Sequence, residues 1–194
     1  MAEVRSLCVY CGSSNAVAPK FLEAAFAFGQ LIGQAGIRLV YGGGRVGLMG
    51  RVADGTLSEG GQVTGIIPHH LHRREVAHGA VSDLLVVDSM HERKQRMAEL
   101  SDAFAVLPGG YGTIDEMFEI LTWRQLGLHD KPIVLVDLGG YWQHLERMVD
   151  QFAAEGFISP VNRALYQRVE RIEDVLPALA ATPAATRPLD RDRL

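Results

Sequence analysis

Short apolar runs of strand length alternate along this chain with segments whose apolar residues recur at helical spacing. The runs are rich in valine, leucine and isoleucine and cover residues 6–11, 37–44, 63–68, 83–88, 103–110 and 131–137. Such alternation is typical of parallel sheets, whose strands are joined by helical crossovers. The pattern therefore predicts an α/β fold of the doubly wound, Rossmann-like kind, with a mainly parallel sheet and helices on both faces.

The segments between the apolar runs predict the helices. The first helix should start at Pro19, because proline is favoured at the first helical position, and stop at Gly36. Further helices are expected over residues 47–59, 90–101, 113–127, 141–155 and 173–181. The end of the chain is rich in proline, alanine and charge and lacks this pattern. We expect one α/β domain over residues 1–182 and a flexible tail over 183–194.

Length, composition and charge narrow the class of protein. A chain of 194 residues with 47% hydrophobic residues can bury one sizeable core. A formal net charge of −4 gives no general attraction to nucleic acid or to an anionic membrane. The apolar runs are far shorter than the roughly 20 residues that span a bilayer, and the first residues do not resemble a signal peptide. We expect a cytoplasmic protein that binds neither nucleic acid nor membrane.

Cys8 and Cys11 form a C-x-x-C motif, a spacing that also occurs in redox pairs and metal sites. Here the motif falls on the first expected strand, where an odd separation sends two side chains to opposite faces. No second pair completes a zinc site. The segment at residues 68–79 carries three histidines within four residues, and these cannot easily all reach one metal ion. We expect neither a metal nor a cofactor.

Three glycine-rich segments follow expected strands and should share the sheet edge at which parallel sheets bind ligands. They contain Gly12 and Ser13 in CGSSN, Gly43 and Gly44 in YGGGRVGLMG, and Gly109 in LPGGYGT. The second segment matches the G-x-G-x-x-G dinucleotide pattern, but the next strand ends without the acid that would hold a ribose. The Walker pattern fails because no Gly-Lys-Ser/Thr follows. The loops suit a compact phosphorylated ligand.

Charged residues near these loops are candidates for chemistry. A helix at residues 89–100 places Arg93 and Lys94 on the methionine stripe that should face inward. They either pair with a neighbouring acid at the margin of the core or point into a polar cleft, where arginine suits phosphate or carboxylate. Thr113 and Glu116 have the spacing of a capping box. A cap does not explain the two glycines before it, so Glu116 is also a candidate for chemistry on a ligand.

The segments YGGGRVGLMG, MHERK, SDAFAVLPGG, PGGYGTIDE and TWRQLGLHDKP resemble the Lonely guy family of cytokinin riboside 5′-monophosphate phosphoribohydrolases, in order and spacing. The resemblance covers about residues 5–180. It implies a nucleotide-binding, cofactor-free enzyme that hydrolyses the N-glycosidic bond of adenosine-type 5′-monophosphates. The products would be free base and ribose 5-phosphate. It also implies a homodimer with active sites near the subunit interface.

The same resemblance assigns residues to the site. It implies that Arg93 and Glu116 are catalytic. It also implies nucleotide contacts from Glu75, Lys94, Gly110, Tyr111, Gly112, Thr113 and Thr122. Breaking a ribosyl C–N bond builds positive charge on the sugar, which a carboxylate such as Glu116 stabilises. Arg93 would either hold the phosphate or counter negative charge on the leaving base.

Two other functions explain fewer of these sequence features. A non-catalytic nucleotide carrier or sensor would share the glycine loops, but binding alone does not require Arg93 and Glu116 together. Members of the family were long named lysine decarboxylases, a reaction that needs a lysine Schiff base with pyridoxal phosphate. The chain has only three lysines and is short for such an enzyme. The sequence leaves open whether AMP or an N6-modified nucleotide is preferred.

Overall fold

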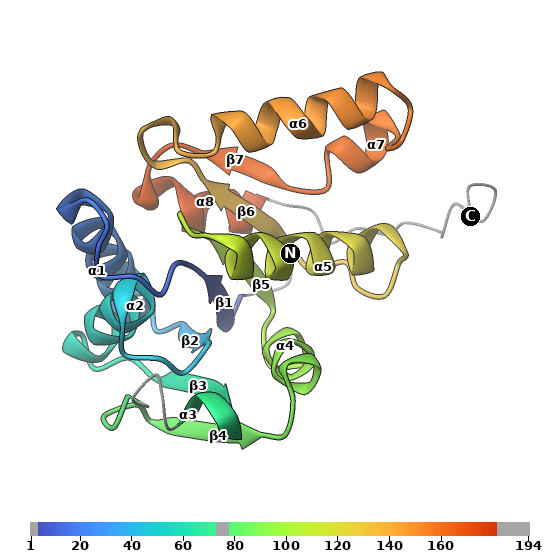
Figure 1. The fold of residues 1–194 in the computed structure, drawn as a ribbon. Helices are drawn as coiled ribbons and strands as arrows, with labels where there is room; N and C mark the ends of the chain where they lie inside the picture. The colour runs from blue at the N-terminus through green and yellow to red at the C-terminus, as the bar shows by residue number, and fades with distance from the viewer. Residues whose placement is uncertain (1–3, 73–77, 182–194) are drawn as a thin grey trace.

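The computed structural model describes residues 4–72 and 78–181, and within them the chain forms a seven-stranded sheet (Figure 1). The strand order is β4-β3-β2-β1-β5-β6-β7, and every neighbouring pair is parallel. The strands are β1 (Ser6–Tyr10), β2 (Arg38–Tyr41), β3 (Val63–Pro68), β4 (Asp83–Val87), β5 (Ala103–Val106), β6 (Ile133–Val136) and β7 (Gln167–Val169). The predicted α/β class is confirmed.

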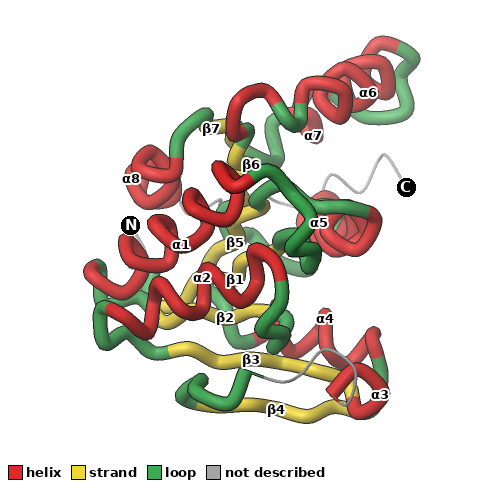
Figure 2. Tube along the Cα trace, turned by 60° about the vertical axis from the view of Figure 1, so that its left-hand side comes forward, coloured by secondary structure: helices red, strands yellow, loops and turns green. Residues whose placement is uncertain are grey.

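Helices cover both faces of the sheet (Figure 2). One face carries α1 (Pro19–Gln34), α2 (Gly47–Ser58) and α8 (Val175–Ala181). The other face carries α4 (Met90–Glu99), α5 (Tyr111–Gln125) and α6 (Gln143–Ala154). Successive side chains of β1 alternate between the two hydrophobic cores. Leu7 and Val9 point to the first face, while Cys8 and Tyr10 point to the second. The doubly wound arrangement is therefore confirmed.

The C-x-x-C motif behaves as its position on a strand predicts. Cys8 belongs to the core beneath α4 and α5, and Cys11 belongs to the core beneath α1 and α2. Both cysteines are free and buried, and burial raises the pKa of both thiols. The two side chains lie on opposite faces, so the motif cannot act as a redox pair without unfolding the strand.

Helices α1 and α2 touch through glycines. A Cβ atom at Gly29 would lie 2.1 Å from the carbonyl oxygen of Val52. One at Gly55 would lie 2.1 Å from the carbonyl oxygen of Phe26. The backbones of the two helices therefore pack directly against each other. This close packing holds α2 against α1, and the glycine-rich loop that follows β2 leads directly into α2.

The strand order reverses between β1 and β5, and the loops after these two strands leave in opposite directions. A reversal of this kind opens a crevice at the carboxyl ends of the strands. The Gly12 N–H donates to the carbonyl oxygen of Pro108 at 3.0 Å, and the Leu48 N–H donates to that of Gly12 at 2.9 Å. These bonds join the three glycine-rich loops around the crevice.

Several short elements lie outside the predicted set. They are β7, α3 (His69–His72), α7 (Pro160–Arg163) and the 3-10 turn η1 (Leu138–Gly140), whereas the 3-10 turn η2 (Ile172–Asp174) overlaps the start of the helix expected over residues 173–181. Three or four residues are too few for a periodic pattern to show, and β7 is mostly exposed. Within the described residues, no helix is both long enough and apolar enough to cross a bilayer. The expected tail at 183–194 lies outside the described residues.

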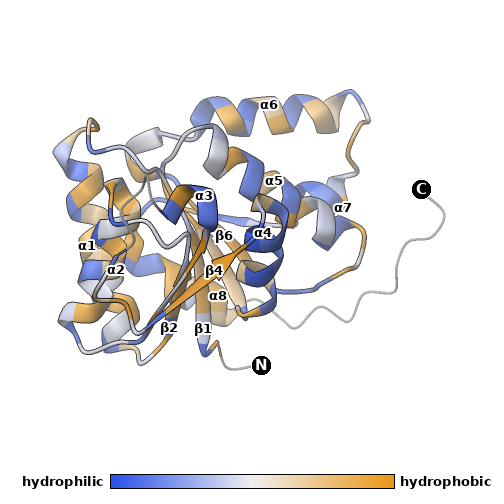
Figure 3. Ribbon diagram, turned by 60° about the horizontal axis from the view of Figure 1, so that its bottom comes forward, coloured by the Kyte–Doolittle hydropathy of each residue, from blue (hydrophilic) through white to orange (hydrophobic). Residues whose placement is uncertain are grey.

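The strands of the sheet are hydrophobic, whereas the covering helix α4 is largely hydrophilic. Figure 3 shows hydrophobic strands beside α4, which is coloured largely as hydrophilic. Yet α4 buries Arg93 and Lys94 together with Met97 and Ala98. The prediction that both cations face inward is confirmed. Ion partners for these two charges must therefore come from the elements packed against α4.

Candidate active site

A cavity of about 260 Å³ opens at the carboxyl ends of β1, β2 and β5, where the strand order reverses. One part of its wall is polar and consists of Ser13, the first turn of α5 and the side chains of Arg93, Asp115 and Glu116. The rest is apolar and includes Met49, Leu71, Met90 and Met97. The cavity therefore offers charge and hydrogen-bond donors beside a soft apolar surface.

The N-terminus of α5 faces the cavity. Gly110 is the N-cap, and no side chain caps the helix. The first helical bond runs from the Ile114 N–H to the Gly110 carbonyl oxygen at 3.1 Å. The N–H groups of residues 111–113 thus lack the partners that the helix interior provides, and they lie in the cavity wall. Such an arrangement attracts an anion.

The predicted capping box is wrong. Thr113 lies inside the first turn of α5, and Glu116 bonds to Arg93 instead of to the helix start. The glycines explain the difference, because a Cβ at Gly109 would lie 2.0 Å from Thr113 Oγ1. Glycine lets the loop fold down onto Thr113, so the helix begins two residues before the predicted start.

Arg93 and Glu116 form a buried ion pair at the cavity. The Arg93 Nη1 group donates to Glu116 Oε1 at 2.7 Å, and its Nε group donates to the Ile66 carbonyl oxygen at 3.1 Å. Gly42 makes room for this guanidinium, because a Cβ there would lie 1.9 Å from Nη2. Three separate elements, β3, α4 and α5, thereby hold the pair in one orientation.

Burial and the ion pair with Arg93 act on the pKa of Glu116 in opposite directions. Burial raises the pKa of Glu116 above its ordinary value of 4.5, and the Arg93 guanidinium opposes part of that rise. The second carboxylate oxygen has no hydrogen-bond partner in the described part of the chain. Glu116 lines the cavity, so this oxygen is available to a bound molecule.

Lys94 does not line the cavity. Its Nζ atom lies 3.0 Å from Asp115 Oδ2 and 3.1 Å from Glu119 Oε1, which ties α4 to α5. Of the two interpretations offered for the inward cations, pairing with a neighbouring acid accounts for Lys94. Arg93 combines both, since its paired guanidinium also lines the cavity.

The other predicted residues divide into two groups. Gly12, Ser13 and residues 110–113 line the cavity. Gly43, Gly44 and Gly109 lie outside the lining, and Thr122 is exposed with its hydroxyl donating to the Phe118 carbonyl oxygen at 2.7 Å. Glu75 lies outside the described residues. Gly43 has a φ of +78° and packs against Ile67, so it shapes the loop from behind.

Sequence reasoning missed part of the wall. Met49 and Leu71 gave no signal, because an apolar residue that lines a cavity looks like any core residue. Asp115 was not among the predicted site residues. The glycine in front of Arg93, Gly42, was detectable only as a member of the dinucleotide-like pattern.

The histidines near β3 do not gather around one point. His78 Nε2 lies 2.8 Å from Asp54 Oδ1 on α2, while His69 and His70 are exposed on α3. In the ranges 4–72 and 78–181, no three side chains of the types that bind metals form a cluster.

Comparisons with known proteins identify relatives of this chain. A family model described as possible lysine decarboxylase matches residues 49–179. The cytokinin riboside 5′-monophosphate phosphoribohydrolase of Rhodococcoides fascians is 45% identical over 178 residues, which cover 91% of this chain and 88% of that protein. A protein with the same activity in its name from Arabidopsis thaliana is 40% identical over 183 residues, covering 91% and 86%.

Solved structures share the fold. The molybdenum cofactor binding protein of the phototrophic bacterium Rippkaea orientalis superposes with a TM-score of 0.71 at 22% identity, covering 93% of this chain and 98% of that one. The molybdenum cofactor carrier protein of Chlamydomonas reinhardtii gives a TM-score of 0.71 at 21% identity, covering 92% and 97%. These similarities support the fold only.

Proposed function

Since this chain belongs to the Lonely guy family of cytokinin riboside 5′-monophosphate phosphoribohydrolases, we propose that it hydrolyses the N-glycosidic bond of a cytokinin riboside 5′-monophosphate or of AMP. The products are the free base and ribose 5-phosphate. The observation that carries the proposal is the buried Arg93–Glu116 pair beside an uncapped helix N-terminus in one cavity. A binding protein needs the helix end but has no need of the pair.

The helix N-terminus is the natural place for the 5′-phosphate. The N–H groups of residues 111–113 and the dipole of α5 favour a dianion there, and Ser13 in the same polar part of the wall can add a hydroxyl. A phosphate fixed at this point holds the attached ribose over the second turn of α5. Glu116 stands on that turn.

In this proposal Glu116 acts on the ribose. Hydrolysis breaks the bond between ribose C1′ and the purine nitrogen, and the electron pair leaves with the base, which takes up a proton. Positive charge develops on the ribose, and an ionised Glu116 in the cavity wall stabilises it. The unpartnered carboxylate oxygen can also accept a proton from the water that attacks C1′.

Arg93 interacts with both Glu116 and the ligand in this proposal. Its hydrogen bond orients the carboxylate and favours the ionised form. Its positive charge also attracts either the phosphate or the base as negative charge builds there. In this scheme Lys94 acts by holding α4 against α5, and the nucleotide contact that the resemblance assigns to it remains a proposal.

The family model's description as possible lysine decarboxylase does not fit the cavity. Its lining contains no lysine. Lys94 is ion-paired with two acids, and Lys131 donates to the Ala98 carbonyl oxygen at 2.7 Å. A Schiff base with pyridoxal phosphate needs a lysine that faces the site.

The test is chromatography of the products formed from AMP and from N6-isopentenyladenosine monophosphate. The wild type should release free base and ribose 5-phosphate, and Glu116→Gln should be slower by about 10²- to 10⁴-fold. Glu99→Gln, at an exposed ion pair with Arg96 on α4, is the matched control and should act like the wild type. Binding without release of base from either nucleotide would favour a carrier and refute the enzyme.

We also propose that the enzyme is a cytoplasmic homodimer that binds neither nucleic acid nor membrane. The family resemblance supports the dimer. Large apolar side chains on the surface are consistent with it, because Phe157 is 83% exposed and Leu128 is 70% exposed.

A further inference from the structure

Tyr141 contacts the glycine loop from outside the cavity. Its hydroxyl donates to the carbonyl oxygen of Gly109 at 2.8 Å, although the two residues are 32 positions apart. Tyr141 follows β6 and η1, whereas Gly109 follows β5. This hydrogen bond thus joins the segments that follow two neighbouring strands, at the start of α5.

The bond acts on the peptide that joins Gly109 to Gly110. In a trans peptide the carbonyl group and the following N–H group point in opposite directions, and the described backbone has no cis peptide bond. A donor that holds the Gly109 carbonyl oxygen therefore also orients the Gly110 N–H. Gly110 lines the cavity, while Tyr141 is absent from its lining. Within the described residues the Gly110 N–H has no hydrogen-bond acceptor.

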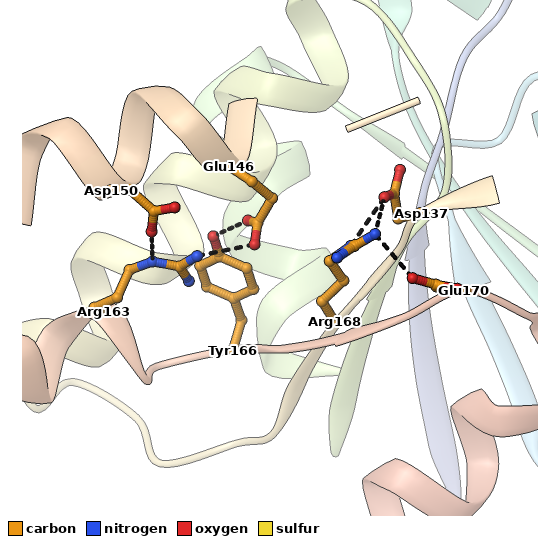
Figure 4. Close-up of polar contacts among 7 residues, drawn as sticks. All are labelled: Asp137, Glu146, Asp150, Arg163, Tyr166, Arg168 and Glu170. Atoms are coloured by element: carbon orange, nitrogen blue, oxygen red, sulfur yellow. Dashed lines mark hydrogen bonds and ion pairs between the residues drawn. The ribbon is translucent and has the colours of Figure 1, made fainter. Parts of the chain in front are cut away.

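Flanking contacts hold the Tyr141 ring. Its ring packs edge-on against Phe21 of α1 at 5.6 Å and against Trp142 at 4.8 Å between ring centres. The adjacent Trp142 N–H donates to Asp137 Oδ1 at 2.6 Å. Asp137 is fully buried, and its other oxygen lies 2.7 Å from Arg168 Nη2 on β7 (Figure 4). An ion pair whose carboxylate is buried thereby fixes the segment that carries Tyr141.

We propose that Tyr141 is a positioning residue for the phosphate, acting through the Gly109–Gly110 peptide; this inference rests on the proposed function. Two glycines in succession give a loop with little conformational restriction, and its peptide planes rotate unless something holds them. The tyrosine hydroxyl holds one plane so that the Gly110 N–H points to the phosphate. Donation to the carbonyl oxygen also polarises that peptide, which makes the N–H a stronger donor.

The test compares Tyr141→Phe with Tyr166→Phe. The first change removes the hydroxyl and keeps the ring. The second removes a tyrosine hydroxyl that donates to Glu146 on α6, away from the cavity lining (Figure 4). Calorimetry gives the dissociation constants of AMP and of adenosine, which lacks the phosphate. Thermal melting checks that both variants are folded.

Tyr141→Phe should weaken AMP binding about two- to tenfold, which is the effect of one hydrogen bond, and leave adenosine binding unchanged. Tyr166→Phe should change neither constant. Unaltered AMP binding by Tyr141→Phe, or an equal loss for AMP and adenosine, would overturn the inference. Release of base by the wild type is assayed separately. A wild type that binds AMP without releasing base would refute the proposed function, while the binding comparison would still decide the role of Tyr141.

Discussion

The Arg93 guanidinium and the Glu116 carboxylate share the cavity wall, and the guanidinium opposes part of the rise in the pKa of Glu116 that burial causes. Removing two charges from water costs several kcal/mol per ion, and a pair recovers that cost only with good geometry and further hydrogen bonds. The Ile66 carbonyl oxygen supplies one such bond to Arg93. The pair is thus weak evidence for stability and stronger evidence for function, because it holds a carboxylate in the wall of a cavity.

The pKa of Glu116 should depend on Arg93. Burial raises this pKa above 4.5 and Arg93 lowers it, so Arg93→Gln should raise it further. In the wild type, activity that needs ionised Glu116 should fall as the pH drops through a pKa higher than 4.5. A carbon-13 NMR titration of the Glu116 carboxyl measures the shift directly. An unchanged or lower pKa in Arg93→Gln would contradict the assignment of the pair.

Gly42→Ala should displace Arg93 without unfolding the protein. The added Cβ would lie 1.9 Å from Nη2, at the flexible end of the arginine side chain, so the guanidinium moves and the backbone does not. A misplacement of about 1 Å costs about a hundredfold in rate, and kcat/KM should fall by that factor. The control Gly79→Ala adds a Cβ in open space and should keep full activity. Equal activity of the two variants would refute the role of Gly42.

At the residue level, the sequence predicted which residues form the site better than it predicted which partners they bond to. Arg93 and Glu116 stood out by position and by family resemblance, yet no pattern indicated that they bond across 23 residues. Thr113 and Glu116 matched a capping box, and the local match failed because tertiary partners were available. Tyr141 gave no signal, since its role depends on a loop 32 residues away.

Among the elements, α1 and α2 are joined by the tightest glycine contacts. Gly55→Ala would gain roughly 1 kcal/mol of helix propensity, but overpacking costs roughly 1–3 kcal/mol, at the upper end here because the clash is with backbone. The free energy of unfolding should fall by about 2 kcal/mol in urea titrations. Gly112→Ala, also helical but with open space around it, should not destabilise. A stabilised Gly55→Ala would show that the helices separate easily.

The predicted elements were correct where the apolar pattern was long. Six strands were predicted within a few residues of their bounds, and the six longer helices were also predicted. The missed strand β7 has the sequence QRV, which carries neither an apolar run nor alternation. Its place is set by pairing with β6 and by the Arg168–Asp137 ion pair, both of which are tertiary. Local sequence therefore could not reveal it.

At the scale of the whole molecule, the reversal in strand order explains why residues from five distant segments share one cavity. Loops after β1, β2 and β5 meet there because parallel strands present their carboxyl ends at one edge. This arrangement follows from the βαβ pattern, which the sequence predicted. The single domain over residues 1–182 stays a prediction.

The proposed homodimer makes a direct prediction for the assembled protein. Sedimentation equilibrium at micromolar concentration should give twice the chain mass of 21.2 kDa. The exposed Phe157 and Leu128 would then lose accessible surface in hydrogen-exchange or footprinting experiments only if they lie in the interface. A mass of one chain over the whole concentration range would refute the dimer.

The two cysteines on opposite faces of β1 provide a built-in chemical reporter. Burial raises the pKa of both thiols, so both react slowly with an alkylating reagent, and Cys8 is reached only when the surrounding structure opens. Cys8 lies beneath α4 and α5, so its alkylation reports opening of that face. Cys11 lines the cavity, so a bound nucleotide shields it while leaving Cys8 unaffected. One strand thus lets mass spectrometry follow cavity occupancy and core opening in the same sample, without any introduced label.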